Sequence, residues 1–178
     1  MKGITIIIAL IVMYVVNIPA QDADSKYAEN LLKAGEAAPN FVLNGSDGAS
    51  VSLEAYRGSY VVLDFWASWC PDCRRDIPAV KEMYDTYYNK GVAFVSVSFD
   101  TDSAAWKKCL NDYGMKWTQV SELKKWKETQ VSKDFHIEWI PTMYLIDPEG
   151  KVVLGTVMTT KMKSVLERLD SQDRFIKK

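Results

Sequence analysis

The stretch VVLDFWASWCPDC at residues 61–73 decides the fold. It begins with the run 61–66, which is apolar except for one acid, Asp64. Runs of this kind are typical of strands that are covered on both faces of a sheet. Cys70 and Cys73 follow at the point where an amphipathic helical pattern begins. The stretch therefore predicts a buried strand that leads into a helix carrying two cysteines.

The spacing of the two cysteines predicts thiol–disulfide exchange. Two cysteines separated by two residues at a helix start can form a disulfide without straining the backbone. Unpaired N–H groups and the helix dipole stabilise a thiolate at Cys70, and the thiolate is the form that attacks a disulfide. Cys73, one turn further in, can then displace the substrate. Pro71 suits the first helical turn because its missing N–H would have no partner there. Zinc sites use the same spacing, so metal binding stays open at this point.

Outward from this stretch, predicted strands and helices alternate along the chain. Strand patterns occupy residues 41–43, 51–53, 92–99, 117–120, 142–146 and 151–154, and the first and last pairs form hairpins. Helical patterns occupy residues 102–113 and 127–135 and a last segment beginning near residues 159–160. The side chains expected in the core from the three longer helices are Ile77, Val80, Tyr84 and Tyr87, then Trp106, Cys109, Leu110 and Tyr113, then Met162, Val165, Leu166 and Leu169. This order predicts an α/β fold with a mixed central sheet.

The N-terminus has the pattern of a secretory signal peptide. Lys2 precedes an apolar run at residues 4–16, which is shorter than the roughly 20 residues of a spanning helix. Ile18 is larger than the cleavage pattern prefers, so an uncleaved membrane anchor is the alternative. Export would place the protein where disulfides persist. We expect a signal peptide at 1–20, a lead-in helix or linker at 21–34 and one folded domain at 35–178.

Four motifs resemble those of one family, the TlpA/ResA branch of exported thioredoxin-like reductases. Residues 62–70 resemble the active-site strand of thioredoxins, and residues 35–41 with the hairpin at 44–53 are similar to that branch. So are Ile140-Pro141-Thr142 and the hairpin that follows. The resemblance implies a thioredoxin-like fold: a mixed central sheet with flanking helices, an N-terminal β-hairpin and a central αβ insertion between Phe99 and Pro141.

The resemblance also implies roles for individual residues. Cys70 would be the attacking cysteine and Cys73 the resolving one. Pro141 would be a cis-proline facing them, since an X-Pro bond is where the cis form costs least. The Ile140 backbone would pair with an extended substrate. Trp69 and Pro71, beside the cysteines, are expected to bind the substrate together with Ile140 and Pro141. Pro78 matches the proline that kinks the active-site helix.

Two acids are candidates for proton transfer. Asp64 matches the buried acid of thioredoxins, which exchanges protons with the inner thiol, and burial would raise its pKa. Asp76 matches the glutamate that tunes the cysteines in the TlpA/ResA branch. That branch usually lacks the strand aspartate, so which acid moves the proton stays open. The alternatives are a buried acid satisfied by a hydrogen bond for Asp64 and a solvated acid for Asp76.

Other functions depend on Cys109, His136 and Ala67. Cys109 lies on an apolar helical face, which favours an inert core thiol. His136, the only histidine, is expected at the surface or in packing. Together with Cys70 and Cys73 they could form a zinc site, or His136 could serve a non-enzymatic copper-binding module. A peroxiredoxin-like peroxidase is a further alternative, but Ala67 stands where the peroxide-binding hydroxyl would be required.

These observations predict an exported, periplasmic protein-disulfide oxidoreductase, and we expect it to act as a reductase. A formal net charge of −1 lacks the basic excess that nucleic-acid binding requires. We expect a monomer that needs no cofactor besides the Cys70–Cys73 pair. The resemblance implies protein substrates, re-reduction by a membrane thiol donor, and clients in cytochrome c maturation. The residues themselves leave the client and the direction of exchange open, because reduction, oxidation and isomerisation use the same two cysteines.

Overall fold

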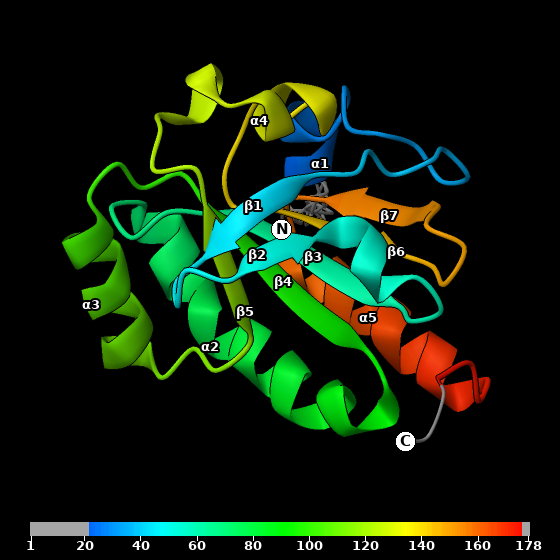
Figure 1. The fold of residues 1–178 in the computed structure, drawn as a ribbon. Coiled ribbons are helices and arrows are strands. Elements are labelled where there is room, and N and C mark those ends of the chain that lie inside the picture. Colours follow the sequence, from blue (N-terminus) through cyan, green and yellow to red (C-terminus); the bar gives the residue numbers. More distant parts are fainter. Residues whose placement is uncertain (1–21, 176–178) are drawn as a thin grey trace, which may run out of the picture.

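A mixed seven-stranded sheet forms the centre of the protein, in the strand order β2-β1-β5-β4-β3-β6-β7 (Figure 1). The computed structural model describes residues 22–175. The strands are β1 Val42–Gly45, β2 Ser50–Ser52, β3 Val61–Trp66, β4 Ala93–Ser98, β5 Thr118–Ser121, β6 Thr142–Ile146 and β7 Val152–Thr156. The helices are α1 Ala23–Tyr27, α2 Pro71–Tyr87, α3 Ser103–Tyr113, α4 Gln130–Asp134 and α5 Thr159–Ser171.

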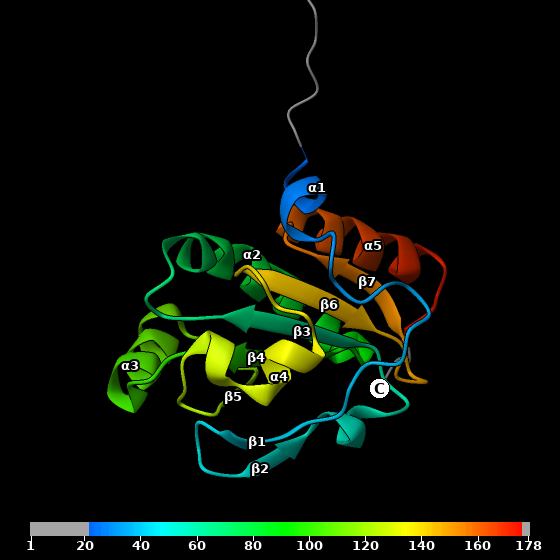
Figure 2. The same cartoon turned by 90° about the horizontal axis from the view of Figure 1, so that it is seen from above.

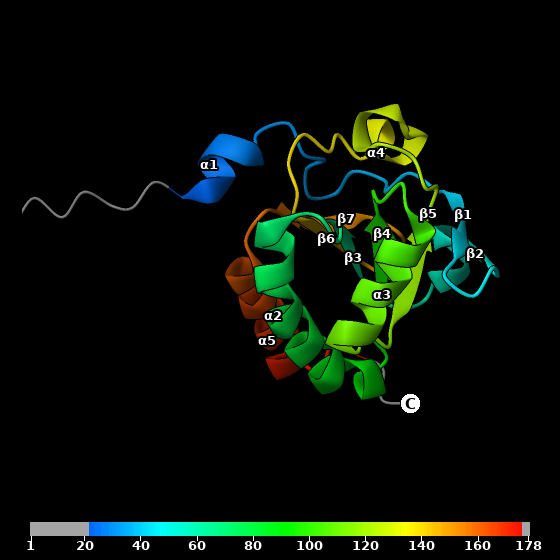
Figure 3. The same ribbon diagram turned by 90° about the vertical axis from the view of Figure 1, so that its left-hand side faces the viewer.

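Strand β3 is an interior strand of the sheet, and all its side chains are apolar except one. All of its residues are buried, between the parallel strand β4 and the antiparallel strand β6. The steps from β3 to β4 and from β4 to β5 run in the same direction across the sheet. Right-handed crossovers then bring α2 and α3 to the same face. Figure 3 shows these two helices and α5 on one side of the sheet and α4 on the other.

An aromatic cluster fills the core on the α4 side of the sheet. The Phe65 ring lies 5.3 Å from the Phe135 ring and 6.2 Å from the Tyr144 ring, measured between centroids. Phe99 stacks on Phe65, and Phe41 reaches Phe135 edge-on. Large buried aromatic side chains contribute most of the apolar area that a core removes from water. The cluster thus fixes β3 and the segment that precedes β6 relative to each other.

The predicted strands and the N-terminal and C-terminal hairpins are confirmed, as is the thioredoxin-like fold with its inserted α3 and β5. The predicted helix at 127–135 is wrong in its extent. A 3₁₀ turn covers Trp126–Glu128, and α4 starts only after Thr129, whose extended backbone and side-chain hydroxyl cap the helix. Further 3₁₀ turns cover Leu53–Tyr56 and Tyr88–Lys90.

Three side chains expected in the core are more exposed than predicted. Tyr113, in the last turn of α3, has an exposed fraction of 36%. Tyr84 is only partly buried, because Met83 occupies the buried position in that turn of α2. Val165 is likewise partly buried at the edge of the core. The other predicted core residues of the three longer helices are buried.

The predicted signal peptide at residues 1–20 lies outside the described residues, and the predicted domain boundaries stay predictions. Within residues 22–175, none of the helices combines the length and the apolar character needed to cross a bilayer.

Candidate active site

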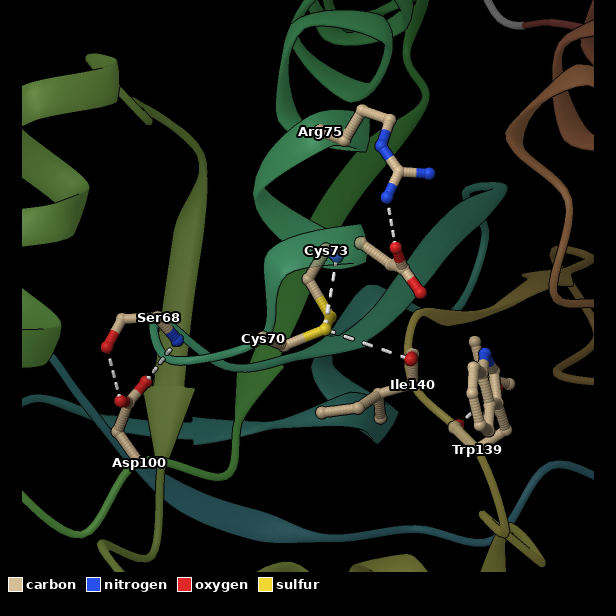
Figure 4. Close-up of a disulfide and its surroundings, with 9 residues drawn as sticks. Ser68, Cys70, Cys73, Arg75, Asp100, Trp139 and Ile140 are labelled. Atoms are coloured by element: carbon tan, nitrogen blue, oxygen red, sulfur yellow. Dashed lines mark hydrogen bonds and ion pairs between the residues drawn. A yellow bond between two sulfur atoms is a disulfide. The ribbon is translucent and has the colours of Figure 1, made fainter.

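Cys70 and Cys73 form a disulfide at the N-terminus of α2, with their Cα atoms 5.3 Å apart (Figure 4). Cys70 is the N-cap residue, and Pro71 occupies the first turn, where no N–H partner is needed. The Cys73 backbone N–H points at Cys70 Sγ over 3.1 Å. In the reduced protein this N–H and the helix dipole would stabilise a thiolate on Cys70. The site is therefore suited to a nucleophilic thiol at Cys70.

The loop before β6 faces the disulfide. The Ile140–Pro141 peptide bond is cis, as predicted. The Ile140 carbonyl oxygen lies 3.8 Å from Cys70 Sγ, and Figure 4 shows this carbonyl directed at the sulfur. Ile140 itself is buried, whereas the Trp69 side chain next to Cys70 has an exposed fraction of 55%. The sulfur thus faces a backbone carbonyl, and the residue that precedes Cys70 carries an exposed aromatic ring; both can contact a polypeptide.

Asp64 is buried in β3, with an exposed fraction of 6%. The Ser96 hydroxyl donates a hydrogen bond of 3.0 Å to Asp64 Oδ2, and Trp117 Nε1 donates one of 2.8 Å to Ser96 Oγ. Burial raises the pKa of Asp64 to about 7; the Ser96 hydrogen bond lowers it and the Asp76 charge raises it. Asp64 therefore titrates close to neutral pH, where a group that exchanges protons with a thiol is most useful.

Asp76 lies three residues after Cys73 on α2 and is half-buried. Burial raises the pKa of Asp76, while the charge of Arg75 and the Thr159 side chain lower it. The Asp76 charge raises the pKa of Asp64, but it is the smallest of the three influences on that group, after burial and the Ser96 hydrogen bond. On the outer side of α2, Arg75 pairs with Asp72, and both side chains are exposed. An exposed pair of this kind contributes little to stability.

One residue of the site, Asp100, was not predicted from the sequence. It follows β4 and is almost fully buried, with an exposed fraction of 2%. Its carboxylate accepts hydrogen bonds from the Ser68 backbone N–H (2.9 Å), the Ser68 hydroxyl (2.5 Å) and the Ser98 hydroxyl (2.6 Å). Figure 4 shows Asp100 holding the chain just before Cys70. The signal available in the sequence was an acid directly after an apolar strand. An acid in that position is expected to be buried, and a buried carboxylate needs several hydrogen-bond donors.

Cys109 and His136 do not join the disulfide in a metal site. Cys109 is a free, buried thiol, and burial raises its pKa. His136 is exposed, and its Nδ1 atom lies 3.0 Å from the Asn30 carbonyl oxygen. Among residues 22–175, no three His, Cys, Asp or Glu side chains gather closely enough to hold a metal ion. A peroxidase would need a hydroxyl at position 67, which is Ala67. The neighbouring Ser68 hydroxyl does not replace it, because it donates its hydrogen bond to Asp100.

Comparison with known proteins gives a consistent result. The family model described as the AhpC/TSA family matches residues 34–154. The thiol-disulfide oxidoreductase ResA of Bacillus anthracis is 33% identical over 141 residues, which cover 78% of this chain and 79% of that protein. ResA of Bacillus subtilis (strain 168) is 32% identical over 122 residues, covering 68% of this chain and 66% of that protein.

Solved structures of thiol–disulfide oxidoreductases are also similar. The thioredoxin domain of a thiol-disulfide oxidoreductase from Bacteroides vulgatus has a TM-score of 0.71 and 32% identity, covering 78% of this chain and 98% of that one. A putative thiol:disulfide interchange protein DsbE from Chlorobium tepidum has a TM-score of 0.69 and 34% identity, covering 80% and 98%.

Proposed function

This chain belongs to the AhpC/TSA family and is a thiol–disulfide oxidoreductase of thioredoxin-like fold, and from this premise we propose that it reduces disulfides in exported proteins. The observation that carries the proposal is the position of Cys70, at the start of α2 and 3.8 Å from the Ile140 carbonyl oxygen. An extended client segment paired with the Ile140 backbone would present its disulfide to Cys70.

The reaction proceeds by two exchanges of one sulfur for another. The Cys70 thiolate attacks one sulfur of the client disulfide, so that a Cys70–client bond forms and a client thiolate leaves. Cys73 then loses its proton and attacks Cys70 Sγ, which forms the Cys70–Cys73 disulfide and releases the second client thiolate. The client gains two electrons and the cysteine pair loses two. Protonation of the client thiolates completes the balance, and Asp64 or Asp76 is proposed to accept the proton from Cys73.

The acids of the site support the reducing direction. A strongly oxidising pair owes its high potential to a stabilised thiolate in the reduced form. Negative charge on Asp76 and, above about pH 7, on Asp64 opposes a thiolate, so it disfavours the reduced form. The positive charge of Arg75 would favour the thiolate, but Arg75 forms an ion pair with Asp72, whose negative charge offsets that effect. The pair is therefore expected to give up its electrons readily.

The proposal extends to the setting of the protein. The signal-peptide pattern at residues 1–20 supports export, and we place the mature protein in the periplasm as a monomer. A membrane thiol donor would return the cysteine pair to the reduced state after each turnover. Clients in cytochrome c maturation follow from the resemblance to the TlpA/ResA branch. The mass of the protein recovered from an exporting cell tests this part, because cleavage removes residues 1–20.

The reduction potential of the Cys70–Cys73 pair tests the direction. The protein is equilibrated with dithiothreitol redox buffers, and the free thiols are counted by alkylation and mass spectrometry. We expect a potential near that of thioredoxin, about −270 mV. A potential near that of a strong oxidant, about −120 mV, would contradict the reductase assignment.

A further inference from the structure

The lead-in segment before β1 is attached to the domain by a partly buried carboxylate. Asp24, in α1, accepts hydrogen bonds of 2.8 Å from the Thr156 hydroxyl, the Val157 backbone N–H and Lys161 Nζ. Only 15% of its side-chain surface is exposed. Figure 2 shows α1 beside β7, which holds Thr156, and α5, which holds Lys161; Val157 lies between these two elements. Charge-assisted bonds to a shielded carboxylate are strong, so α1 has a fixed position on the domain.

The next contact of the segment reaches the client-binding loop. The Tyr27 ring stacks on the Trp139 ring with 4.1 Å between centroids and an interplanar angle of 18°. Trp139 immediately precedes Ile140, whose carbonyl faces Cys70. The Trp139 carbonyl oxygen also accepts a hydrogen bond of 2.6 Å from the Thr142 hydroxyl. The stack therefore acts on the residue next to the proposed pairing backbone.

Further contacts continue along the same loop. The Asn30 amide donates a hydrogen bond of 3.0 Å to Glu138 Oε2, and the Asn30 carbonyl oxygen lies 3.0 Å from His136 Nδ1. The Leu32 backbone N–H donates one of 3.1 Å to the Tyr144 hydroxyl, within β6. The lead-in segment thus contacts the chain both before and after the Ile140–Pro141 bond.

We propose that residues 22–33 form a clamp that holds the Trp139–Ile140 backbone in position for an extended client, with Asp24 and Tyr27 as positioning residues. The inference rests on the proposed function, in which the client pairs with Ile140. The clamp does not touch the sulfurs. It acts only on substrates that need the loop, so a polypeptide disulfide depends on it and a small disulfide does not.

The test compares two substrates of the full-length chain in its reduced form. Second-order rate constants are measured with insulin, as a polypeptide disulfide, and with Ellman's reagent, as a small one. Tyr27→Ala should lower the insulin rate constant about threefold to tenfold, which corresponds to the loss of one aromatic pair. Its rate constant with Ellman's reagent should stay at the unsubstituted value. Tyr27→Phe keeps the stacking ring and should restore the insulin rate.

Tyr88→Ala is the matched control, because Tyr88 also contacts an aromatic ring, that of Tyr84, and follows the C-terminal end of α2, the end opposite the cysteines. It should change neither rate. Should Tyr27→Ala fail to fold, Tyr27→Leu keeps the apolar bulk without the stack and should show the same selective loss. Equal rates for Tyr27→Ala and the unsubstituted chain, or an equal loss on both substrates, would overturn the clamp alone. If the unsubstituted chain did not reduce insulin, the proposed function would be wrong as well.

Discussion

The Ser96 hydroxyl donates a hydrogen bond of 3.0 Å to the Asp64 carboxylate across the two central parallel strands of the sheet. This bond stabilises the charged form of Asp64, yet burial dominates and raises the pKa to about 7. A folded-state pKa above the unfolded value of about 3.9 means that the folded protein holds a proton that the unfolded chain releases. Asp64 therefore makes the stability depend on pH as well as serving as a candidate proton carrier.

Asp64→Asn should remove this dependence. The wild-type contribution is fully favourable below about pH 4 and is lost as the pH rises through about 7. Asparagine carries no charge and keeps an acceptor for Ser96. Urea unfolding should therefore show the stability of the variant rising relative to wild type by ~2–4 kcal/mol between pH 4 and pH 8. Asp85→Asn, at an exposed position of α2, is the control. If the stability difference between the variant and wild type did not change with pH, Asp64 would have the same pKa in the folded and unfolded protein, and the raised pKa would be wrong.

The two acids should also differ in their kinetic effects. Asp64→Asn removes a proton acceptor and should slow the resolution step, in which Cys73 must lose its proton. Asp76→Asn should chiefly lower the pKa of Cys70, because it removes a negative charge from α2. The pH dependence of Cys70 alkylation and the rate of decay of the mixed disulfide measure the two effects. If only Asp76→Asn altered both quantities, Asp76 would be the proton carrier and the assignment to Asp64 would be wrong.

Asp100→Asn should destabilise the fold by about 1–3 kcal/mol, because an amide replaces a carboxylate that accepts three hydrogen bonds. It should also slow the reaction of Cys70, since Ser68 is released just before the nucleophile. Asp102→Asn is the matched control: Asp102 caps α3, and asparagine caps helices as well as aspartate does. Urea midpoints for both variants give the comparison. Equal midpoints would contradict the structural role of Asp100.

Cys109 should react last in the native reduced protein. Burial raises the pKa of Cys109, whereas the helix N-terminus favours a thiolate at Cys70, so the thiolate fraction is lower at Cys109. The exposed fractions, 8% for Cys109 and 5% for Cys70, do not separate the two thiols. Iodoacetamide followed by peptide mass spectrometry should find Cys70 labelled first and Cys109 labelled only after denaturant is added. Rapid labelling of native Cys109, or stoichiometric zinc that is lost in Cys109→Ser, would instead support a resolving or metal-binding cysteine.

The sequence predicts the centre of the molecule better than its periphery. The run 61–66 identifies β3 because a continuous apolar run is stable only where both faces of the strand are covered. Cys70 and Cys73 follow from their spacing together with the strand before them and the helix that they begin. Helix α4 is shorter than predicted because the side chain of Thr129 caps it, a local competition that periodicity does not report. Tyr113 shows the same limit, because it continues the apolar face of α3 in the sequence and yet has an exposed fraction of 36%.

Long-range polar contacts escape prediction for a different reason. Asp100 and Ser68 lie 32 residues apart, and Asp24 and Thr156 lie 132 residues apart. Hydrogen bonds of this kind depend on the final placement of elements that no local pattern specifies. The raised pKa of Asp64 could be predicted in direction from its apolar surroundings, but the Ser96 partner could not.

Trapping of a mixed disulfide tests the central claim, that Cys70 attacks and Cys73 resolves, most directly. Reduced Cys73→Ser and Cys70→Ser chains are incubated with insulin, and covalent complexes are counted on non-reducing gels. Cys73→Ser should accumulate complexes because attack occurs and resolution cannot. Cys70→Ser should form few, since Cys73 lies inside the first turn of α2 and not at the N-cap, where unpaired N–H groups stabilise a thiolate. Equal trapping by the two variants, or more by Cys70→Ser, would contradict the assignment of Cys70 as the nucleophile.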